Sequence, residues 1–110
     1  MITRYALFDG TIKDGKTDAF RAAIRDRLVP VLRTFDGVLE VSIAFTDERD
    51  DGAPDLPLIM AVSYPDVETM QAALSSPKRQ AAIAVTGEIF AECFDGHIHH
   101  HVTQRTAFPI

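Results

Sequence analysis

The segment 38–46 constrains the fold most, because its side chains alternate in a way that suits a β-strand. One set of alternate positions is strongly apolar and the other is mixed in character. The apolar set is Leu39, Val41, Ile43 and Phe45, and the mixed set is Val38, Glu40, Ser42 and Ala44. Successive side chains of a strand point to opposite faces of its sheet. The segment therefore predicts a strand with one strongly apolar face.

A helix is predicted over residues 17–35, where apolar side chains recur at spacings of three and four. They are Phe20, Ile24, Leu28, Val31, Leu32 and Phe35. Such spacing places them on one face of an amphipathic helix that must be buried. Thr17 or Asp18 can cap its first turn, and Gly37 suits the left-handed residue that ends many helices. Pro30 lacks a backbone N–H, so a kink or break is expected there.

The remaining elements follow from turn and capping residues. Asp66 can cap a short helix, and Ser76-Pro77 is a start signal for a second helical stretch over residues 81–94. Further strands are predicted over residues 2–8, 57–64 and 97–106, with the acidic segment 47–56 as a long hairpin loop. The order β-α-β-β-α-β predicts a ferredoxin-like α+β fold. In that fold a four-stranded antiparallel sheet carries both helical segments on one face.

Length and composition restrict the classes of protein to which the chain can belong. The 110 residues suit one domain, 1–110, with an ordinary hydrophobic fraction of 46%. A net charge of −5 lacks the basic footprint that nucleic-acid binding requires. No apolar run approaches the length of about 18 residues that spans a membrane, and no export signal is evident. The single cysteine, Cys93, precludes an internal disulfide and favours a cytoplasmic location.

The sheet face without helices predicts a homodimer. Apolar side chains expected on this face are Val38, Ala44, Ala6 and Phe8. Contiguous apolar patches beyond a few hundred Å² are rare on monomers, and a second sheet from a two-fold partner is the natural cover. The alternative is a monomer whose open face is polar enough for water, helped by Glu40, Ser42 and nearby histidines.

The run 96–102 contains the residues most suited to chemistry. In a strand, His97, His99 and His101 share one face at about 7 Å per pair, given a rise of about 3.4 Å per residue. Ile98, His100 and Val102 take the other face and fit better beneath the helices. The three histidines are therefore expected to face a barrel cavity or a dimer interface. Their expected companions from other strands are Arg4, Glu40 and Ser42.

Three roles remain open for these histidines. His99 or His101 can act as a general base, because an imidazole exchanges protons near neutral pH; His97, Glu40, Ser42 and Arg4 would then contact the ligand. Arg4 can stabilise an enolate or a carboxylate. Alternatively, the imidazoles can bind zinc or iron with Glu40 as an oxygen ligand, or they are structural or exposed. Dinucleotide, phosphate-loop and serine-elbow motifs are absent, so nucleotide-dependent and serine-hydrolase chemistry lack sequence support. We predict no cofactor and no metal.

Several features together resemble the EthD-like branch of the dimeric α+β barrel superfamily. They are the helix pattern 20–35, the alternating strand ending at Phe45, the strand exit Tyr64-Pro65-Asp66, and Ser76-Pro77 before an alanine-rich helix. The resemblance covers nearly the whole chain. It implies a dimer in which two sheets close into a barrel that can hold a small apolar ligand. Members include cofactor-free monooxygenases, isomerases, polyketide cyclases and haem proteins.

Two functions are therefore expected, and the activity itself is unassigned. The first is a small cofactor-independent enzyme of oxygenase, isomerase or cyclase type that acts on an apolar molecule in the barrel cavity. The alternative is a non-catalytic binding or accessory dimer, for example in a catabolic pathway. A structural role in a larger assembly is also open, because the acidic loop and the tail Phe108-Pro109-Ile110 can engage another surface.

Overall fold

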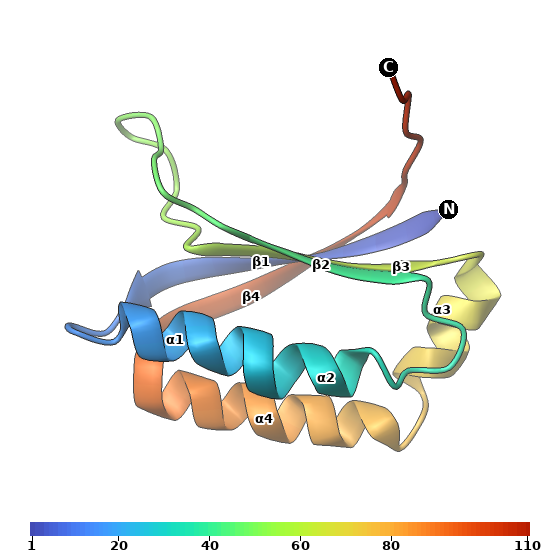
Figure 1. The fold of residues 1–110 in the computed structure, drawn as a ribbon, viewed down its shortest axis with the longest axis horizontal. Coiled ribbons are helices and arrows are strands. Elements are labelled where there is room, and N and C mark those ends of the chain that lie inside the picture. Colours follow the sequence, from blue (N-terminus) through green and yellow to red (C-terminus); the bar gives the residue numbers. More distant parts are fainter.

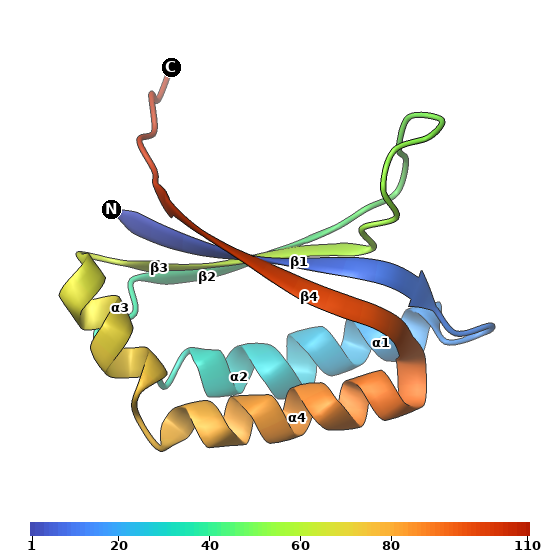
Figure 2. The same cartoon turned by 180° about the vertical axis from the view of Figure 1, so that it is seen from behind.

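The computed structural model describes residues 1–110 and has two layers, a twisted sheet and a layer of helices on one of its faces (Figure 1). The sheet contains β1 (Ile2–Ile12), β2 (Glu40–Phe45), β3 (Leu58–Tyr64) and β4 (Phe94–Gln104). The helical layer contains α1 (Thr17–Ala23), the π-helical turn η1 (Ile24–Leu28), α2 (Val29–Leu32), α3 (Val67–Leu74) and α4 (Lys78–Cys93). Figure 2 shows the same two layers from behind.

The sheet is antiparallel with the strand order β2-β3-β1-β4. This order and the helices on one face confirm the predicted ferredoxin-like α+β fold. The second helical segment consists of two helices, α3 and α4. The register pairs Ala6 with Met60 on β3 and with His100 on β4, so these three side chains share the helix-covered face.

The first helical segment passes Pro30 without a break. Its Val29 N–H donates to the carbonyl of Ile24, five residues earlier, which is the hydrogen bond of a π turn. The wider turn accommodates the proline, whose missing N–H cannot continue the α-helical ladder. The expected cap at Thr17 or Asp18 is wrong, because no side chain caps α1. Gly37 does adopt a left-handed conformation, with φ of +76°.

The caps predicted for the second helical segment are present. The side chain of Asp66 accepts from the backbone N–H of Thr69 at 2.8 Å and so caps α3. Ser76 Oγ accepts from the backbone N–H of Lys78 at 3.2 Å, at the start of α4. These two contacts satisfy amides that have no partner within their own helix.

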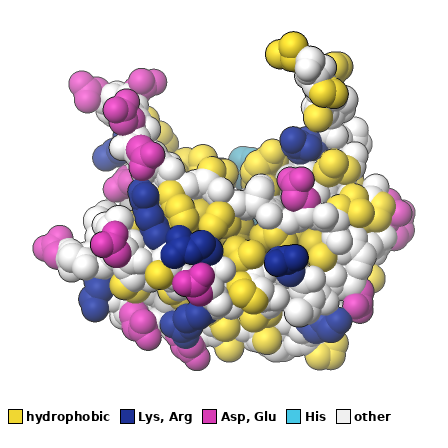
Figure 3. All heavy atoms as spheres, in the orientation of Figure 1, with side chains coloured by type: hydrophobic (Ala, Val, Ile, Leu, Met, Phe, Trp, Pro, Cys, Tyr) yellow, Lys and Arg dark blue, Asp and Glu magenta, His cyan; other side chains and the backbone are white.

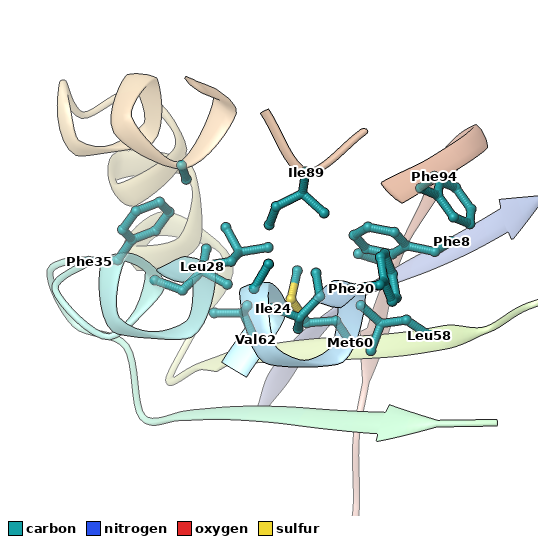
Figure 4. Packing of buried hydrophobic residues seen from close by; sticks show 14 of the residues in the cluster. Phe8, Phe20, Ile24, Leu28, Phe35, Leu58, Met60, Val62, Ile89 and Phe94 are labelled. Carbon is teal, nitrogen blue, oxygen red and sulfur yellow. The ribbon is translucent and has the colours of Figure 1, made fainter. Parts of the chain in front are cut away.

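The core lies between the sheet and the helices, and aromatic rings occupy the end where β4 begins (Figure 4). Phe8, Phe20 and Phe94 are buried, with ring centroids 5.6–6.2 Å apart. The expectation that Ala6 and Phe8 lie on the open face is wrong, because both point to the helices and are 4% and 0% exposed. Val38 lies before β2 and packs against the core, whereas Ala44 is on the open face.

Two segments project from the sheet on the side away from the helices (Figures 1 and 2). One is the hairpin loop 46–57, which is rich in acidic side chains, and the other is the C-terminal tail 105–110. Apolar side chains gather at the end of the tail, where Phe108 is 86% exposed. Figure 3 shows a hollow between the two projections. No helix of the chain is long and apolar enough to cross a membrane.

Candidate functional site

A pocket of about 180 Å³ lies between the helix-covered face of the sheet and the helices. Its lining comes from β1, β3 and β4 on one side and from η1, α2, α3 and α4 on the other. Phe8 and Leu28 line its deep end and are 0% and 1% exposed, while Ile83 lies at its mouth and is 52% exposed. Most lining residues are hydrophobic, and none is acidic. The pocket therefore suits a small apolar molecule.

Three basic side chains, Arg4, Arg79 and His100, line the same pocket. Arg4 pairs with Val102 and His100 pairs with Ala6 across β1 and β4, so the alternation of the strands brings both side chains to the helix-covered face. Arg79 comes from the first turn of α4 and donates from Nη1 to the carbonyl of Leu74 at 3.2 Å. Two strands and one helix thus bring these groups together.

The surroundings of this cluster keep His100 neutral at physiological pH. Partial burial, the positive charges of Arg4 and Arg79, and neighbouring His99 lower its pKa to about 4. Burial and the charge of Arg79 also lower the pKa of Arg4 from its ordinary value. Arginine nevertheless stays protonated in proteins. The pocket therefore combines two cations with an imidazole that has a free proton-accepting nitrogen.

Neither arginine of the cluster has an acidic partner. The ion pairs of the chain all join other residues, for example Lys78 with Asp36 at 2.9 Å and Arg21 with Asp47 at 3.4 Å. Tyr64 is buried near the two arginines, and its burial raises the pKa of its hydroxyl. Partly buried charges are usually compensated by an opposite charge or by hydrogen bonds. A negatively charged or strongly polar ligand atom would supply that compensation.

The histidines named from the sequence lie on the open face of the sheet, as the alternation of residues 97–102 predicted. The register places His97 opposite Asp9, His99 opposite Leu7 and His101 opposite Tyr5. His99 Nε2 lies 3.1 Å from Asp9 Oδ2, and the rings of His97 and His99 have centroids 6.5 Å apart. These imidazoles are exposed. They belong to a surface that a partner could cover, on the far side of the sheet from the pocket.

The expected companions of these histidines are not beside them. Glu40 and Ser42 share the open face, but they lie on β2, which β3 and β1 separate from β4. The expectation that Arg4 accompanies them is wrong, because Arg4 points to the helix-covered face and lines the pocket. No three His, Cys, Asp or Glu side chains gather in an arrangement that could hold a metal ion.

Sequence analysis did not identify two of the basic residues in the pocket, His100 and Arg79. The alternation of residues 97–102 placed His100 beneath the helices, where a packing role is the ordinary expectation. Arg79 carries no distinguishing signal, because one arginine in the first turn of a helix is common on solvated surfaces. Only the packing of α4 against the sheet turns its side chain toward Arg4 and His100.

Comparison with known proteins finds similarity in structure and none in sequence families. No family model and no curated protein sequence matches the chain. An EthD (ethyl tert-butyl ether degradation) family protein from Bacillus halodurans aligns with a TM-score of 0.76 and 15% identity, over 96% of this chain and 99% of that one. A cofactor-independent oxygenase from Streptomyces nogalater aligns with a TM-score of 0.64 and 15% identity, over 99% and 97% of the two chains.

A dimeric ferredoxin-like protein of unknown function from Jannaschia has a TM-score of 0.65 and 15% identity, over 94% of this chain and 98% of that one. At these identities the similarity establishes the fold alone, so the chemistry has to be argued from the residues of this chain. The similarity extends over almost the full length of each protein. The chain therefore has the ferredoxin-like α+β fold that its sequence predicted, and it shares this fold with the EthD family protein.

Proposed function

We propose that the chain is a small enzyme that binds a predominantly apolar molecule between its sheet and helices and removes a proton from it. One observation carries this proposal. A neutral imidazole, His100, lies with two guanidinium groups that have no acidic partner, those of Arg4 and Arg79, in an otherwise apolar pocket. A proton acceptor beside a cationic site is the arrangement that enolate-forming reactions require.

The proposed step is the removal of a proton from a carbon atom next to a carbonyl group. The proton passes to the free nitrogen of His100, and the electron pair of the C–H bond moves onto the carbonyl oxygen. The enolate oxygen is then stabilised by the guanidinium groups of Arg4 and Arg79. Burial and the positive charges of Arg4 and Arg79 lower the pKa of His100 to about 4. The negative charge of the enolate offsets the second of these causes, so proton transfer becomes more favourable as the enolate forms.

Enolate formation is a first step common to isomerisation, cyclisation and cofactor-independent oxygenation. The oxygenase from Streptomyces nogalater supports a cofactor-independent reaction on this fold. A base with a low pKa favours an activated substrate, such as a carbon between two carbonyl groups. The second candidate function is binding without turnover, which the same apolar pocket also supports.

We further propose that the chain works as a homodimer joined through its open face. The dimeric Jannaschia protein supports this, as do the apolar side chains Leu7 and Ile59, which lie near the centre of that face. In such a dimer His97, His99 and His101 would face the partner or the barrel interior, together with Ser42 and Glu40. The single buried cysteine, Cys93, supports a reducing compartment such as the cytoplasm.

Proton–deuterium exchange tests the enzymatic proposal directly. Benzoylacetone, a one-ring 1,3-dicarbonyl compound, is incubated with the protein in deuterated buffer. The loss of the proton signal from the carbon between its two carbonyl groups is followed by NMR. We expect saturable acceleration that is lost in His100→Ala and retained in His99→Ala. Equal acceleration by both variants would contradict the role of His100. Saturable binding with no acceleration would favour the non-catalytic function.

A further inference from the structure

We propose that the pocket selects a monoanion of about single-ring size, with its carboxylate between Arg4 and Arg79 and its apolar part in the deep end. This inference rests on the proposed function and adds the charge and size of the ligand. It follows from three properties of the pocket: the sign of its charge, the position of that charge and its volume.

The charge of the pocket lining is entirely positive. Arg4 and Arg79 contribute two guanidinium groups, and no acidic residue lines the pocket. Each guanidinium group has several N–H donors, and in the free protein the hydrogen bond from Arg79 to the Leu74 carbonyl uses only one of them. Guanidinium donors match the two oxygens of a carboxylate in geometry and charge. A cationic ligand would be repelled.

The position of the charges gives the ligand an orientation. His100 and Ile83 are exposed and the two arginines are half-buried, whereas Phe8 and Leu28 at the other end are fully buried. A carboxylate at the mouth would keep part of its hydration while it contacts the arginines. The apolar part of the same molecule would replace water against the phenylalanine and leucine side chains, which is the favourable direction of the hydrophobic effect.

The volume of the pocket limits the apolar part. An engineered apolar cavity of about 150 Å³ holds one benzene molecule. The pocket here, at about 180 Å³, has room for one ring with a short substituent. Fused polycyclic ligands would require the helices to move away from the sheet. The preferred ligands are therefore aromatic or alicyclic monocarboxylates, including those with a second carbonyl oxygen that could become the enolate.

Calorimetric titration with three one-ring probes tests this inference. Benzoate is the anion, benzamide is its neutral isostere and benzylamine is the cation. We expect benzoate to bind at least tenfold more tightly than benzamide, which corresponds to the contribution of hydrogen bonds to a charged group. Benzylamine should not bind. Added sodium chloride should weaken benzoate binding and leave benzamide binding unchanged, because only the charged contact is screened.

Arginine-to-methionine substitutions identify the residues that cause the preference for benzoate over benzamide. Arg79→Met keeps most of the length of the side chain and removes its charge. It should lower benzoate affinity roughly tenfold and leave benzamide affinity unchanged, and Arg4→Met should do the same. Arg33→Met is the matched control, because Arg33 is exposed and lies outside the pocket. Bound benzoate should also raise the pKa of His100, read from its NMR titration, since a nearby anion offsets the charges of Arg4 and Arg79.

The outcomes separate this inference from the function on which it rests. Equal binding of benzoate and benzamide would overturn the anion selectivity, while exchange dependent on His100 would still stand. An equal loss of benzoate binding in Arg33→Met and Arg79→Met would also overturn it. If none of the three probes binds saturably, both the ligand class and the pocket as a binding site are contradicted.

Discussion

His99 and His100 are neighbours in the chain but lie on opposite faces of β4. His100 lines the pocket beneath the helices, whereas His99 contacts Asp9 on the open face at 3.1 Å. The strand alternation that separates them also separates their surroundings. Burial and the charges of Arg4 and Arg79 lower the pKa of His100 to about 4. The pair offers matched variants, one on each face, for every test of the site.

The first prediction concerns the pH dependence of stability. The pKa of His100 is about 4 in the folded chain and 6.5 ordinarily, so as the pH falls the unfolded chain takes up this proton first. The free energy of unfolding should therefore decrease as the pH falls from 6.5 to 4, and this contribution should level off below. Chemical denaturation across this range should show a smaller decrease for His100→Gln. If His99→Gln reduced this loss of stability as much as His100→Gln does, the assignment of the pH dependence to His100 would be contradicted.

The second prediction concerns a buried pair of hydroxyl groups. Thr3 Oγ1 and Ser63 Oγ are 2.8 Å apart, and the two residues are 1% and 2% exposed. Thr3→Val leaves the serine hydroxyl without this partner and should cost about 1–3 kcal/mol of stability. The double variant Thr3→Val/Ser63→Ala should lose less than the sum of the two single variants. Additive losses in urea denaturation would show that the two hydroxyl groups do not depend on each other.

The third prediction concerns the close approach of β1 and β4 where Gly10 pairs with Gly96. A Cβ atom at Gly96 would lie 2.2 Å from the carbonyl oxygen of Asp9 and 2.9 Å from the ring of Phe94. Gly96→Ala should therefore cost about 1–3 kcal/mol, because the backbone must shift. Gly87→Ala is the control, since no atom lies near its added methyl group and alanine favours the helix. Thermal melting of both variants checks this, and equal midpoints would contradict it.

The fourth prediction concerns the open face. Leu7→Asp together with Ile59→Asp introduces charges at the centre of this face and should convert the proposed dimer to a monomer. Native mass spectrometry of untagged protein measures the change. Val67→Asp places a charge on an apolar residue of α3 that is 37% exposed and should leave the dimer intact. A wild-type chain that is already monomeric at micromolar concentration would refute the dimer.

The fifth prediction concerns the C-terminal tail. The tail 105–110 projects from the sheet on its open side (Figure 1), and Phe108 and Ile110 within it are exposed. We expect them to contact the partner in the dimer, so that deletion of residues 105–110 shifts the equilibrium toward monomer. The double variant Phe108→Ser/Ile110→Ser tests the apolar contact without shortening the chain. An unchanged dissociation constant in both would assign the tail to another role.

Most of the fold could be predicted because local signals specify its elements. The alternation around Ile43, the cap at Asp66 and the start at Ser76-Pro77 each act through neighbouring residues, and each matches the structure. The π turn before Pro30 was less predictable, because it depends on how the helix adjusts its hydrogen bonds around the ring. The face taken by Phe8 was predicted wrongly, since the first strand is apolar on both faces.

The sequence by itself determined the order of the elements, the face shared by His97, His99 and His101, and the absence of nucleotide-binding motifs. These follow from periodicity and spacing, which act over a few residues. Only the tertiary structure decided that Arg4 lies on the helix-covered face, in one pocket with Arg79 and His100. That meeting depends on the register between β1 and β4 and on the rotation of α4. The register and the helix rotation are both set by packing between residues far apart in the chain, and no local sequence pattern specifies that packing.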